Sequence, residues 1–458
     1  MILLINPRAT RPLHRRFPLS VMALGAALPE GETWEIVDGN RPDPDVFNAV
    51  VQRAEAAEAA GDRVRLLAFT VMPGPQLAAA VPLTKRLKKR LPRVPVVWGG
   101  YFPSLYPGPV LAAPYVDWIV RGQGERTFLE LLEVLEGRRE PSSVAGLGWK
   151  DNGSVRLNAE RPWVGPDELP PPPYGRIDVD DYLEPTFLGR RSGVYQASIG
   201  CPYTCNFCGV ISVYGSREKF ENPARTVENL SGLVRGHGMD GLHFYDNNFF
   251  QSEAHAAEIA ERMAPLELRW WCEARIDVML RFSDRTWEKI RRSGCTMVYL
   301  GAESGSDATL ARMSKNLTTE QTLAFAARAR AHGIVPEFSF MFGDPDDPEG
   351  EAEKTLAFIR RLKAVNPAMK LITYYYTPTP QRRGTYGNVD PVDGTPGSLE
   401  EWIEPDWMGW MTHEDPRVPW LKPALRDRVA AFAAASGGLT PADSQEYGHL
   451  RPAFREDA

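Results

Sequence analysis

Short apolar runs alternate with helical patterns in two separate series along this chain of 458 residues. The first series covers residues 1 to about 140, with a helix predicted at Glu125–Leu135, and a hairpin with its turn at Asn152-Gly153 follows it. The second series covers residues from about 190 to 378, with a strand predicted at Val194–Ile199 and helices at Asp284–Arg292 and Thr319–His332. Such alternation predicts parallel sheets covered by helices. The second series holds about six βα units, which is typical of a full or partial barrel with its chemistry at the carboxyl ends of the strands. The sequence therefore predicts an α/β protein.

A proline run marks the break between the two series. Pro170 to Pro173 are four consecutive prolines, which neither continue a helix nor join a central strand. We expect a Rossmann-like parallel-sheet domain, a proline-rich linker, a partial (β/α)6 barrel of the TIM type and a small aromatic-rich C-terminal cap. The predicted bounds of these four parts are 1–160, 161–189, 190–380 and 381–458.

The charge balance excludes several classes of partner. The chain has 53 Lys and Arg against 59 Asp and Glu, a net charge of −6, so it lacks the basic surplus of a general nucleic-acid or anionic-membrane binder. No stretch approaches the roughly 18 uninterrupted apolar residues that a membrane span needs. The N-terminus starts apolar and then turns basic, the reverse of a signal peptide. We therefore expect a cytoplasmic protein that binds no nucleic acid.

Three of the five cysteines lie within eight residues, in the spacing C-x3-C-x2-C. They are Cys201, Cys205 and Cys208, in a loop that follows a predicted strand. In a reducing compartment, such clustering indicates metal binding rather than disulfides. Thiolates are the natural ligands of iron–sulfur clusters, and three ligands leave one iron of a four-iron cluster open. A structural zinc site is the alternative, with Cys272 or a histidine as its fourth ligand.

This loop, at the end of the first strand of a serial βα region, resembles that of the radical S-adenosylmethionine (SAM) superfamily over roughly residues 190–380. The resemblance implies a 4Fe–4S cluster whose open iron binds the amino and carboxylate groups of SAM. Reductive cleavage of SAM then gives a 5′-deoxyadenosyl radical that abstracts hydrogen from a substrate. Phe207, the aromatic residue before the third cysteine, also fits the pattern.

Later strand ends resemble the SAM-contacting segments of that superfamily. LHFYDNNFF, WWCEARIDVM and YLGAESGSD would meet the amine, the carboxylate and the ribose of SAM, while FSFMFGDPDDPEGE resembles a glycine-proline turn near the adenine. A turn with an Asx cap is an equally good account of the Asp–Asn–Asn run, and a helix cap is the better account of Ser306 and Asp307. The implied SAM-contacting residues, besides Phe207, are Asp246, Asn247, Asn248, Glu273, Arg275, Glu303 and Ser304.

The N-terminal domain before such a barrel resembles the cobalamin-binding subclass, which includes radical methyltransferases and the anaerobic Mg-protoporphyrin monomethyl ester cyclase. Ligands of parallel sheets bind past the carboxyl ends of the strands, and glycine there allows close approach of a bulky ligand. The chain has no D-x-H-x-x-G motif, whose His is the lower axial ligand in many cobalamin domains; His14 is the nearest histidine. A degenerate domain without cobalamin is the alternative. The candidate cobalamin-binding residues are Asn6, Thr70, Val71, Met72, Gly99 and Gly100.

The C-terminal region gathers tryptophans and prolines. Trp402, Trp407, Trp410 and Trp420 lie within nineteen residues. They would form the wall of a large apolar substrate or a plug that seals the barrel, and both roles stay open. Arg382 and Arg383 either meet an anionic substrate group or lie in a solvated loop.

The sequence therefore predicts a cobalamin-dependent radical SAM enzyme that methylates an unactivated carbon of a large apolar or natural-product substrate. The subclass implies a 4Fe–4S cluster, SAM, cobalamin and an electron donor of the flavodoxin or ferredoxin type. Oxidative cyclisation or rearrangement without methyl transfer is the first alternative. An iron–sulfur electron-transfer or binding protein is the second. No catalytic acid or base is assignable.

Overall fold

The computed structural model describes residues 1–10, 15–42, 44–250, 252–380, 386–389, 394–414 and 417–439. The chain divides into two compact units. Unit 1 contains residues 1–164, 168–182 and 394–408, and unit 2 contains 165–167, 183–393 and 409–458. His14, Arg382 and Arg383 fall outside the described residues, so their predicted roles stay predictions. No helix in the described part of the chain is long and apolar enough to cross a membrane.

Unit 1 is built on a seven-stranded sheet in the order β2-β1-β3-β4-β5-β6-β7. Strands β1 to β5 run parallel, and β6 and β7 form an antiparallel hairpin at one edge, as the Asn152-Gly153 turn predicts. The strands of unit 1 are β1 (Ile2–Asn6), β2 (Trp34–Asp38), β3 (Leu66–Thr70), β4 (Val96–Gly99), β5 (Trp118–Val120), β6 (Leu147–Asp151) and β7 (Ser154–Leu157). Its helices are α1 (Leu19–Ala27), α2 (Val46–Ala59), α3 (Pro75–Arg90), α4 (Tyr101–Leu105), α5 (Pro107–Ala112), α6 (Glu125–Leu135) and α15 (Leu399–Trp402).

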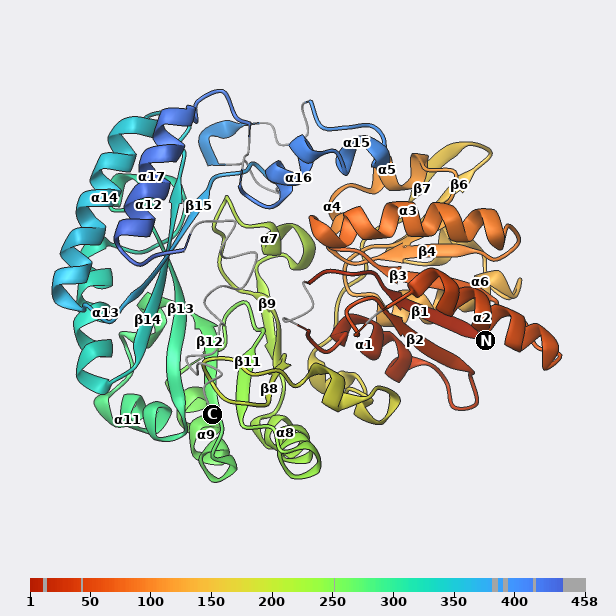
Figure 1. The fold of residues 1–458 in the computed structure, drawn as a ribbon, viewed down its shortest axis with the longest axis horizontal. Coiled ribbons are helices and arrows are strands. Elements are labelled where there is room, and N and C mark those ends of the chain that lie inside the picture. Colours follow the sequence, from red (N-terminus) through yellow and green to blue (C-terminus); the bar gives the residue numbers. More distant parts are fainter. Residues whose placement is uncertain are drawn as a thin grey trace. The chain divides into compact units, whose positions relative to one another are not determined.

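Unit 2 is built on six parallel strands in the order β15-β14-β13-β12-β11-β8 (Figure 1). These strands are β8 (Ser192–Tyr195), β11 (Gly241–Phe244), β12 (Arg269–Ala274), β13 (Cys295–Glu303), β14 (Val335–Phe342) and β15 (Lys370–Tyr375). The connecting helices are α8 (Pro223–His237), α9 (Glu253–Met263), α10 (Ile276–Met279), α11 (Asp284–Arg292), α12 (Asp307–Arg312), α13 (Thr319–His332) and α14 (Pro348–Val365). Sequential strand order with helical crossovers is the partial barrel that the sequence predicts, so the predicted α/β fold class is confirmed.

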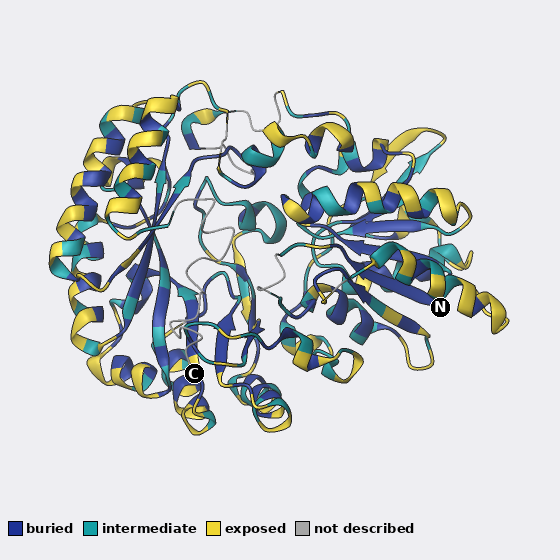
Figure 2. Ribbon diagram, in the orientation of Figure 1, coloured by how far each residue is buried: buried dark blue, intermediate teal, exposed yellow. Residues whose placement is uncertain are grey.

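Local sequence signals set where several of these helices begin. Ser283 accepts a hydrogen bond from the Thr286 backbone N–H at the start of α11, and Thr318 forms a capping box with Gln321 at the start of α13. The strands of both sheets are largely buried and the outward faces of the helices are exposed (Figure 2). Phe325 of α13 and Phe358 of α14 pack against Phe338 and Phe340 of β14, so one face of β14 is covered by helices.

The strand expected at Val194–Ile199 is divided in the structure. The chain leaves the six-stranded sheet after Tyr195, where the Asp246 carboxylate accepts a hydrogen bond of 3.0 Å from the Ala197 backbone N–H. It then pairs antiparallel as β9 (Ser198–Cys201) with β10 (Arg217–Phe220), a strand that the sequence analysis missed. The short helix α7 (Gly209–Tyr214) lies between them in the sequence.

The C-terminal region is divided between the two units. In unit 1, Trp402 is completely buried and its ring lies 5.3 Å from that of Phe102 and 4.6 Å from that of Tyr106. Helix α16 (Pro405–Met411) contains the division, and α17 (Pro423–Ala435) packs on β15 in unit 2. A tryptophan packed in this way is part of the core of unit 1. The substrate-wall alternative is therefore wrong for Trp402.

Candidate functional site

The cysteine loop connects β9 to α7. Cys201 is the last residue of β9, Cys208 precedes the first residue of α7, and Cys205 is buried between them. Asn206 anchors this loop on helix α12: its side-chain amide donates to the Arg312 carbonyl at 2.9 Å and its backbone N–H to the Met313 carbonyl at 3.2 Å. These two hydrogen bonds, to carbonyls about a hundred residues away in the sequence, hold the loop at the carboxyl end of the sheet.

The thiols of Cys201 and Cys205 lie close enough to Cys208 to raise the pKa of that residue. Burial raises the pKa of Cys208 to about 12, with further increases from Cys205 and Cys201 and a partial decrease from Lys315. Burial also raises the pKa of Cys201, with smaller contributions from Glu218 and Cys205. In the described residues, no three His, Cys, Asp or Glu side chains are grouped to hold a single ion. A 4Fe–4S cluster has a different requirement, because each thiolate binds its own iron, so three neighbouring thiols fit its ligand set.

Two buried cations lie against this loop. Arg275 donates to the Cys205 sulfur at 3.9 Å and to the Lys315 carbonyl at 2.8 Å, pairs with Asp277 at 2.9 Å, and lies 3.5 Å above the Tyr203 ring. Its guanidinium thus braces the cysteine loop, and a contact of Arg275 with the SAM carboxylate stays a prediction.

Lys315 is the second cation, and the sequence analysis missed it. Its ammonium pairs with Glu303 at 2.8 Å and lies 5.8 Å from the centre of the Phe207 ring. Both side chains of the pair are 11% exposed. Glu303 also adopts a left-handed backbone conformation with φ of 63°, which is uncommon for a residue with a side chain. A lysine twelve residues after the end of β13 gives no motif, so only the fold brings it to the site.

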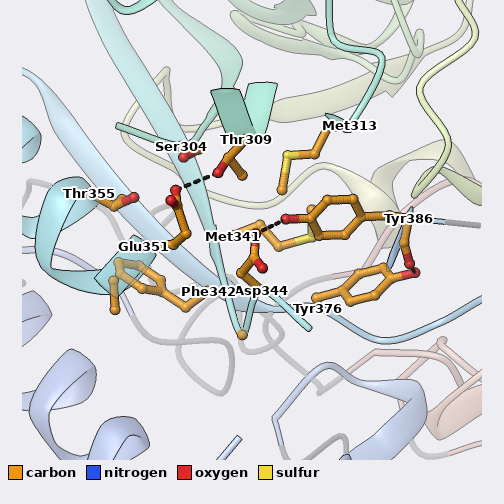
Figure 3. A pocket seen from close by; sticks show the side chains of 12 residues that line it. Ser304, Thr309, Met313, Met341, Phe342, Asp344, Glu351, Thr355, Tyr376 and Tyr386 are labelled. Atoms are coloured by element: carbon orange, nitrogen blue, oxygen red, sulfur yellow. Dashed lines mark hydrogen bonds between the residues drawn. The ribbon is translucent and has the colours of Figure 1, made fainter. Parts of the chain in front are cut away.

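A small pocket of about 10 Å³, room for about one water molecule, lies beside the cysteine loop, past the carboxyl ends of β13, β14 and β15. Figure 3 shows its lining, in which Thr309 donates to Glu351 and Tyr386 to Asp344. Phe207 packs against the group of Met313, Tyr376 and Tyr386 that forms one pocket wall. Its lining residues are Ser304, Thr309, Met313, Met341, Phe342, Gly343, Asp344, Glu351, Ala352, Thr355, Tyr376 and Tyr386.

The predicted SAM-contacting residues lie in several parts of unit 2. Phe207, Arg275 and Glu303 lie with the cysteines, and Ser304 lines the pocket. Asp246 and Asn248 are buried at the end of β11, where the Asn248 amide donates to Glu218 at 3.3 Å. Burial raises the pKa of Asp246 to about 7 and that of Glu218 to about 8.

Glu273 is half-buried near the carboxyl end of β12, opposite Tyr299 in the pairing of β12 with β13. Asn247 is half-buried, between the buried Asp246 and Asn248. The SAM contacts of all eight residues stay predictions.

The carboxyl edge of the sheet in unit 1 carries the candidate cobalamin residues. Asn6 donates to Asp38 at 2.9 Å and accepts from Gln76 at 2.7 Å, so its amide fixes neighbouring side chains. Thr70 accepts a hydrogen bond of 3.0 Å from Ser20, and Val71 is buried. Met72 is 45% exposed at this edge, an apolar side chain available to a ligand.

The two glycines at this edge differ. A Cβ on Gly100, whose φ is 102°, would lie 2.9 Å from the Val71 carbonyl oxygen, so packing within the chain already requires glycine there. A Cβ on Gly99 would make ordinary contacts, the nearest at 3.7 Å. The structure thus accounts for Gly100 by backbone packing, while its approach to cobalamin stays a prediction.

Comparison with known proteins follows the same division of the chain. The model of the radical SAM superfamily matches residues 195–359, and the model of the B12 binding domain matches residues 14–132. An uncharacterized methyltransferase of Pyrococcus horikoshii is 30% identical over 349 residues, which cover 75% of this chain and 73% of the relative. The chain belongs to the cobalamin-binding radical SAM enzymes.

Other relatives of this cobalamin-binding radical SAM enzyme have different reactions in their names. The anaerobic magnesium-protoporphyrin IX monomethyl ester cyclase of Synechocystis is 27% identical, with 55% of this chain and 50% of the relative covered. The cytidylyl-2-hydroxyethylphosphonate methyltransferase of Streptomyces wedmorensis is 26% identical, with coverages of 54% and 52%. The chain thus spans about half the length of these two relatives.

Solved structures share the fold. The radical SAM methyltransferase TsrM from Kitasatospora setae, with cobalamin and a [4Fe-4S] cluster bound, aligns over 100% of this chain and 91% of its own at 19% identity, with a TM-score of 0.67. The cofactors of this cobalamin-binding radical SAM enzyme are accordingly a 4Fe–4S cluster, SAM and cobalamin. The zinc, electron-carrier and degenerate-domain alternatives are therefore set aside.

Proposed function

We propose that this enzyme transfers a methyl group to an unactivated carbon of a largely apolar small molecule. The observation that carries the proposal is that Phe207 of the three-cysteine loop packs against Met313, Tyr376 and Tyr386. The same three side chains line the small pocket at the carboxyl ends of the strands. A ligand bound at the carboxyl ends of these strands would therefore lie beside the cysteine loop. The cluster and cobalamin supply the radical and methyl chemistry.

The residues of the chain would hold and orient SAM. SAM carries a carboxylate, an ammonium and a sulfonium, so it needs both cations and acceptors. Arg275 and Lys315 are the buried cations beside the cysteines, while Glu303, Asp246 and Glu218 are the carboxyl groups. Charge-assisted hydrogen bonds of this kind fix a ligand strongly in a dry site. Cys201, Cys205 and Cys208 would hold the cluster.

Three further points of the proposal concern partners. Reductive SAM cleavage requires an electron, for which we propose a flavodoxin- or ferredoxin-type donor. The substrate is a small molecule; relatives include a hopanoid C-3 methylase, and TsrM has been solved with a tryptophan substrate, which supports an apolar or aromatic body. We propose that the enzyme acts in the cytoplasm.

The products of anaerobic turnover test methyl transfer. The reconstituted enzyme, reduced with a flavodoxin system, is incubated with SAM, and 5′-deoxyadenosine and S-adenosylhomocysteine are quantified. Methyl transfer from SAM leaves S-adenosylhomocysteine, and reductive cleavage of a second SAM leaves 5′-deoxyadenosine and methionine, so radical methylation would give both products. The Cys205→Ala variant is the control and should form no 5′-deoxyadenosine.

Cyclisation or rearrangement remains the second candidate function, because a cyclase is among the relatives. Formation of 5′-deoxyadenosine without S-adenosylhomocysteine would favour it over methyl transfer. The absence of both products would contradict both functions.

A further inference from the structure

A buried carboxyl group on β14 takes no part in the site described so far. Glu337 is completely buried, and neither carboxyl oxygen has a hydrogen-bond partner. Buried polar atoms without a partner are rare in proteins, and each one requires an explanation. Glu337 also forms no salt bridge among the described residues. It is unlike Glu221 of the same unit, which accepts hydrogen bonds from Tyr195 and Thr226.

The side chain of Glu337 lies on the face of β14 opposite the helices. Successive side chains of a strand alternate between its two faces. Phe338 and Phe340 contact helices α13 and α14, so Glu337 and Ser339 face the interior of the partial barrel. Val335, on the same face, packs in the interior cluster of Trp271, Met297 and Tyr299.

Strand register places Glu337 in a polar row that crosses three strands. Glu273 of β12 pairs with Tyr299 of β13, and Tyr299 pairs with Glu337 of β14. The two acids are close enough for Glu273 to raise the pKa of Glu337, although burial is the larger cause. Two carboxyl groups in one apolar interior repel each other when both ionise. Lys370 of β15 pairs with Glu337 in the strand register and partly lowers its pKa, but it makes no salt bridge with it among the described residues. A positive charge brought between the two acids would relieve the repulsion that remains.

The walls next to this row are aromatic. His243 of β11 stacks on Trp271 of β12 with ring centres 3.8 Å apart, and Trp271 packs in the same interior cluster as Tyr299. Aromatic rings provide broad apolar contact and attract cations to their faces. The interior thus combines a flat apolar surface with acidic groups.

We propose that the row of Glu273, Tyr299 and Glu337 binds a protonated nitrogen of the substrate, so that the substrate is an amine on an aromatic or other apolar body. This inference rests on the proposed function, since it assigns the polar end of the molecule that is methylated. Because the Glu337 oxygens are covered, the side chains above them shift when the amine enters.

Ligand binding to the anaerobically reconstituted holoenzyme tests this assignment. The probes are tryptamine, which carries the ammonium, and tryptophol, its neutral alcohol counterpart. Isothermal calorimetry should show tryptamine binding at least tenfold more tightly than tryptophol. The Glu337→Gln variant should lose that preference, and Glu337→Asp, which keeps the acid, should retain it. Glu221→Gln is the matched control, a buried glutamate of the same unit, and should bind tryptamine as the wild type does.

Several outcomes would overturn the inference. They are equal binding of the two probes, no binding of tryptamine at millimolar concentration, or a preference unchanged in Glu337→Gln. Iron content shows whether each variant folds with its cluster. Formation of 5′-deoxyadenosine and S-adenosylhomocysteine in the same samples tests the proposed function separately. A wild type that forms both products without selecting the amine contradicts this inference alone.

Discussion

Replacing Lys315 by methionine tests how the cysteine loop is supported. Lys315 and Glu303 form a 2.8 Å ion pair in which both side chains are 11% exposed. Methionine keeps the length and apolar stem of lysine but leaves the Glu303 carboxylate buried without its partner. Removing one partner of a buried pair costs about 3–5 kcal/mol. We therefore expect Lys315→Met to lower the free energy of unfolding by about that amount.

The double variant Lys315→Met/Glu303→Gln separates the pair from the rest of the packing. With both charges removed, no charged group of the pair is left buried, and replacing a whole pair is often nearly neutral. The assay is urea-induced unfolding of the three proteins in parallel. A loss of under about 1 kcal/mol in the single variant, or an equal loss in the double variant, would refute the reasoning.

Lys315 also lowers the pKa of Cys208 against the effect of burial. Removing it should therefore make the Cys208 thiolate harder to form and reduce the iron and sulfide bound per chain, in the double variant as well as the single one. Wild-type cluster content in both variants would show that Lys315 supports the fold alone.

Three further predictions follow from individual side chains. Replacing Cys201, Cys205 or Cys208 by alanine should abolish both the visible absorbance of the iron–sulfur cluster and SAM cleavage, because each thiolate holds one iron. Full cleavage in any one variant would contradict its role as a ligand. Burial raises the pKa of Glu337 from 4.5 to about 8, so ionisation of its carboxyl group opposes folding. The stability of the wild type should therefore fall as the pH rises from about 4.5 through about 8. The melting temperature of Glu337→Gln should lack this slope, and parallel curves for the two proteins between about pH 6 and about pH 9 would contradict the prediction. Trp402→Ala should destabilise unit 1 by about 3–5 kcal/mol and increase hydrogen exchange in α15. Trp402→Phe keeps part of the ring contacts and should lose less stability. Unchanged exchange in the alanine variant would contradict the packing role of Trp402.

Much of the fold was predictable because hydrophobic periodicity is a local signal. The predicted helices Glu125–Leu135, Asp284–Arg292 and Thr319–His332 have the bounds found in the structure. The division of β8 from β9 was not predictable, since it depends on the Asp246 carboxylate, which lies about fifty residues away in the sequence. β10 was missed for a related reason: REKF has no apolar alternation, and its pairing with β9 decides it.

The candidate site divides in the same way. The three cysteines have a spacing that sequence reasoning detects directly. Lys315 and Glu337 carry no motif, because what distinguishes them is burial and the register of neighbouring strands. Gly100 shows the opposite case, in which a sequence signal has a structural cause. A glycine at a sheet edge suggests a bound ligand, but the φ of 102° and the nearby Val71 carbonyl already require glycine at this position.

The cofactor content of the anaerobically purified enzyme, expressed with cobalamin supplied, tests the central claim most directly. Iron and sulfide are assayed together with the corrinoid spectrum, whose identity is checked by mass. The account predicts about four irons and about one cobalamin per chain. About four irons without cobalamin would contradict it, because cobalamin-dependent methyl transfer could not then be the activity of this chain.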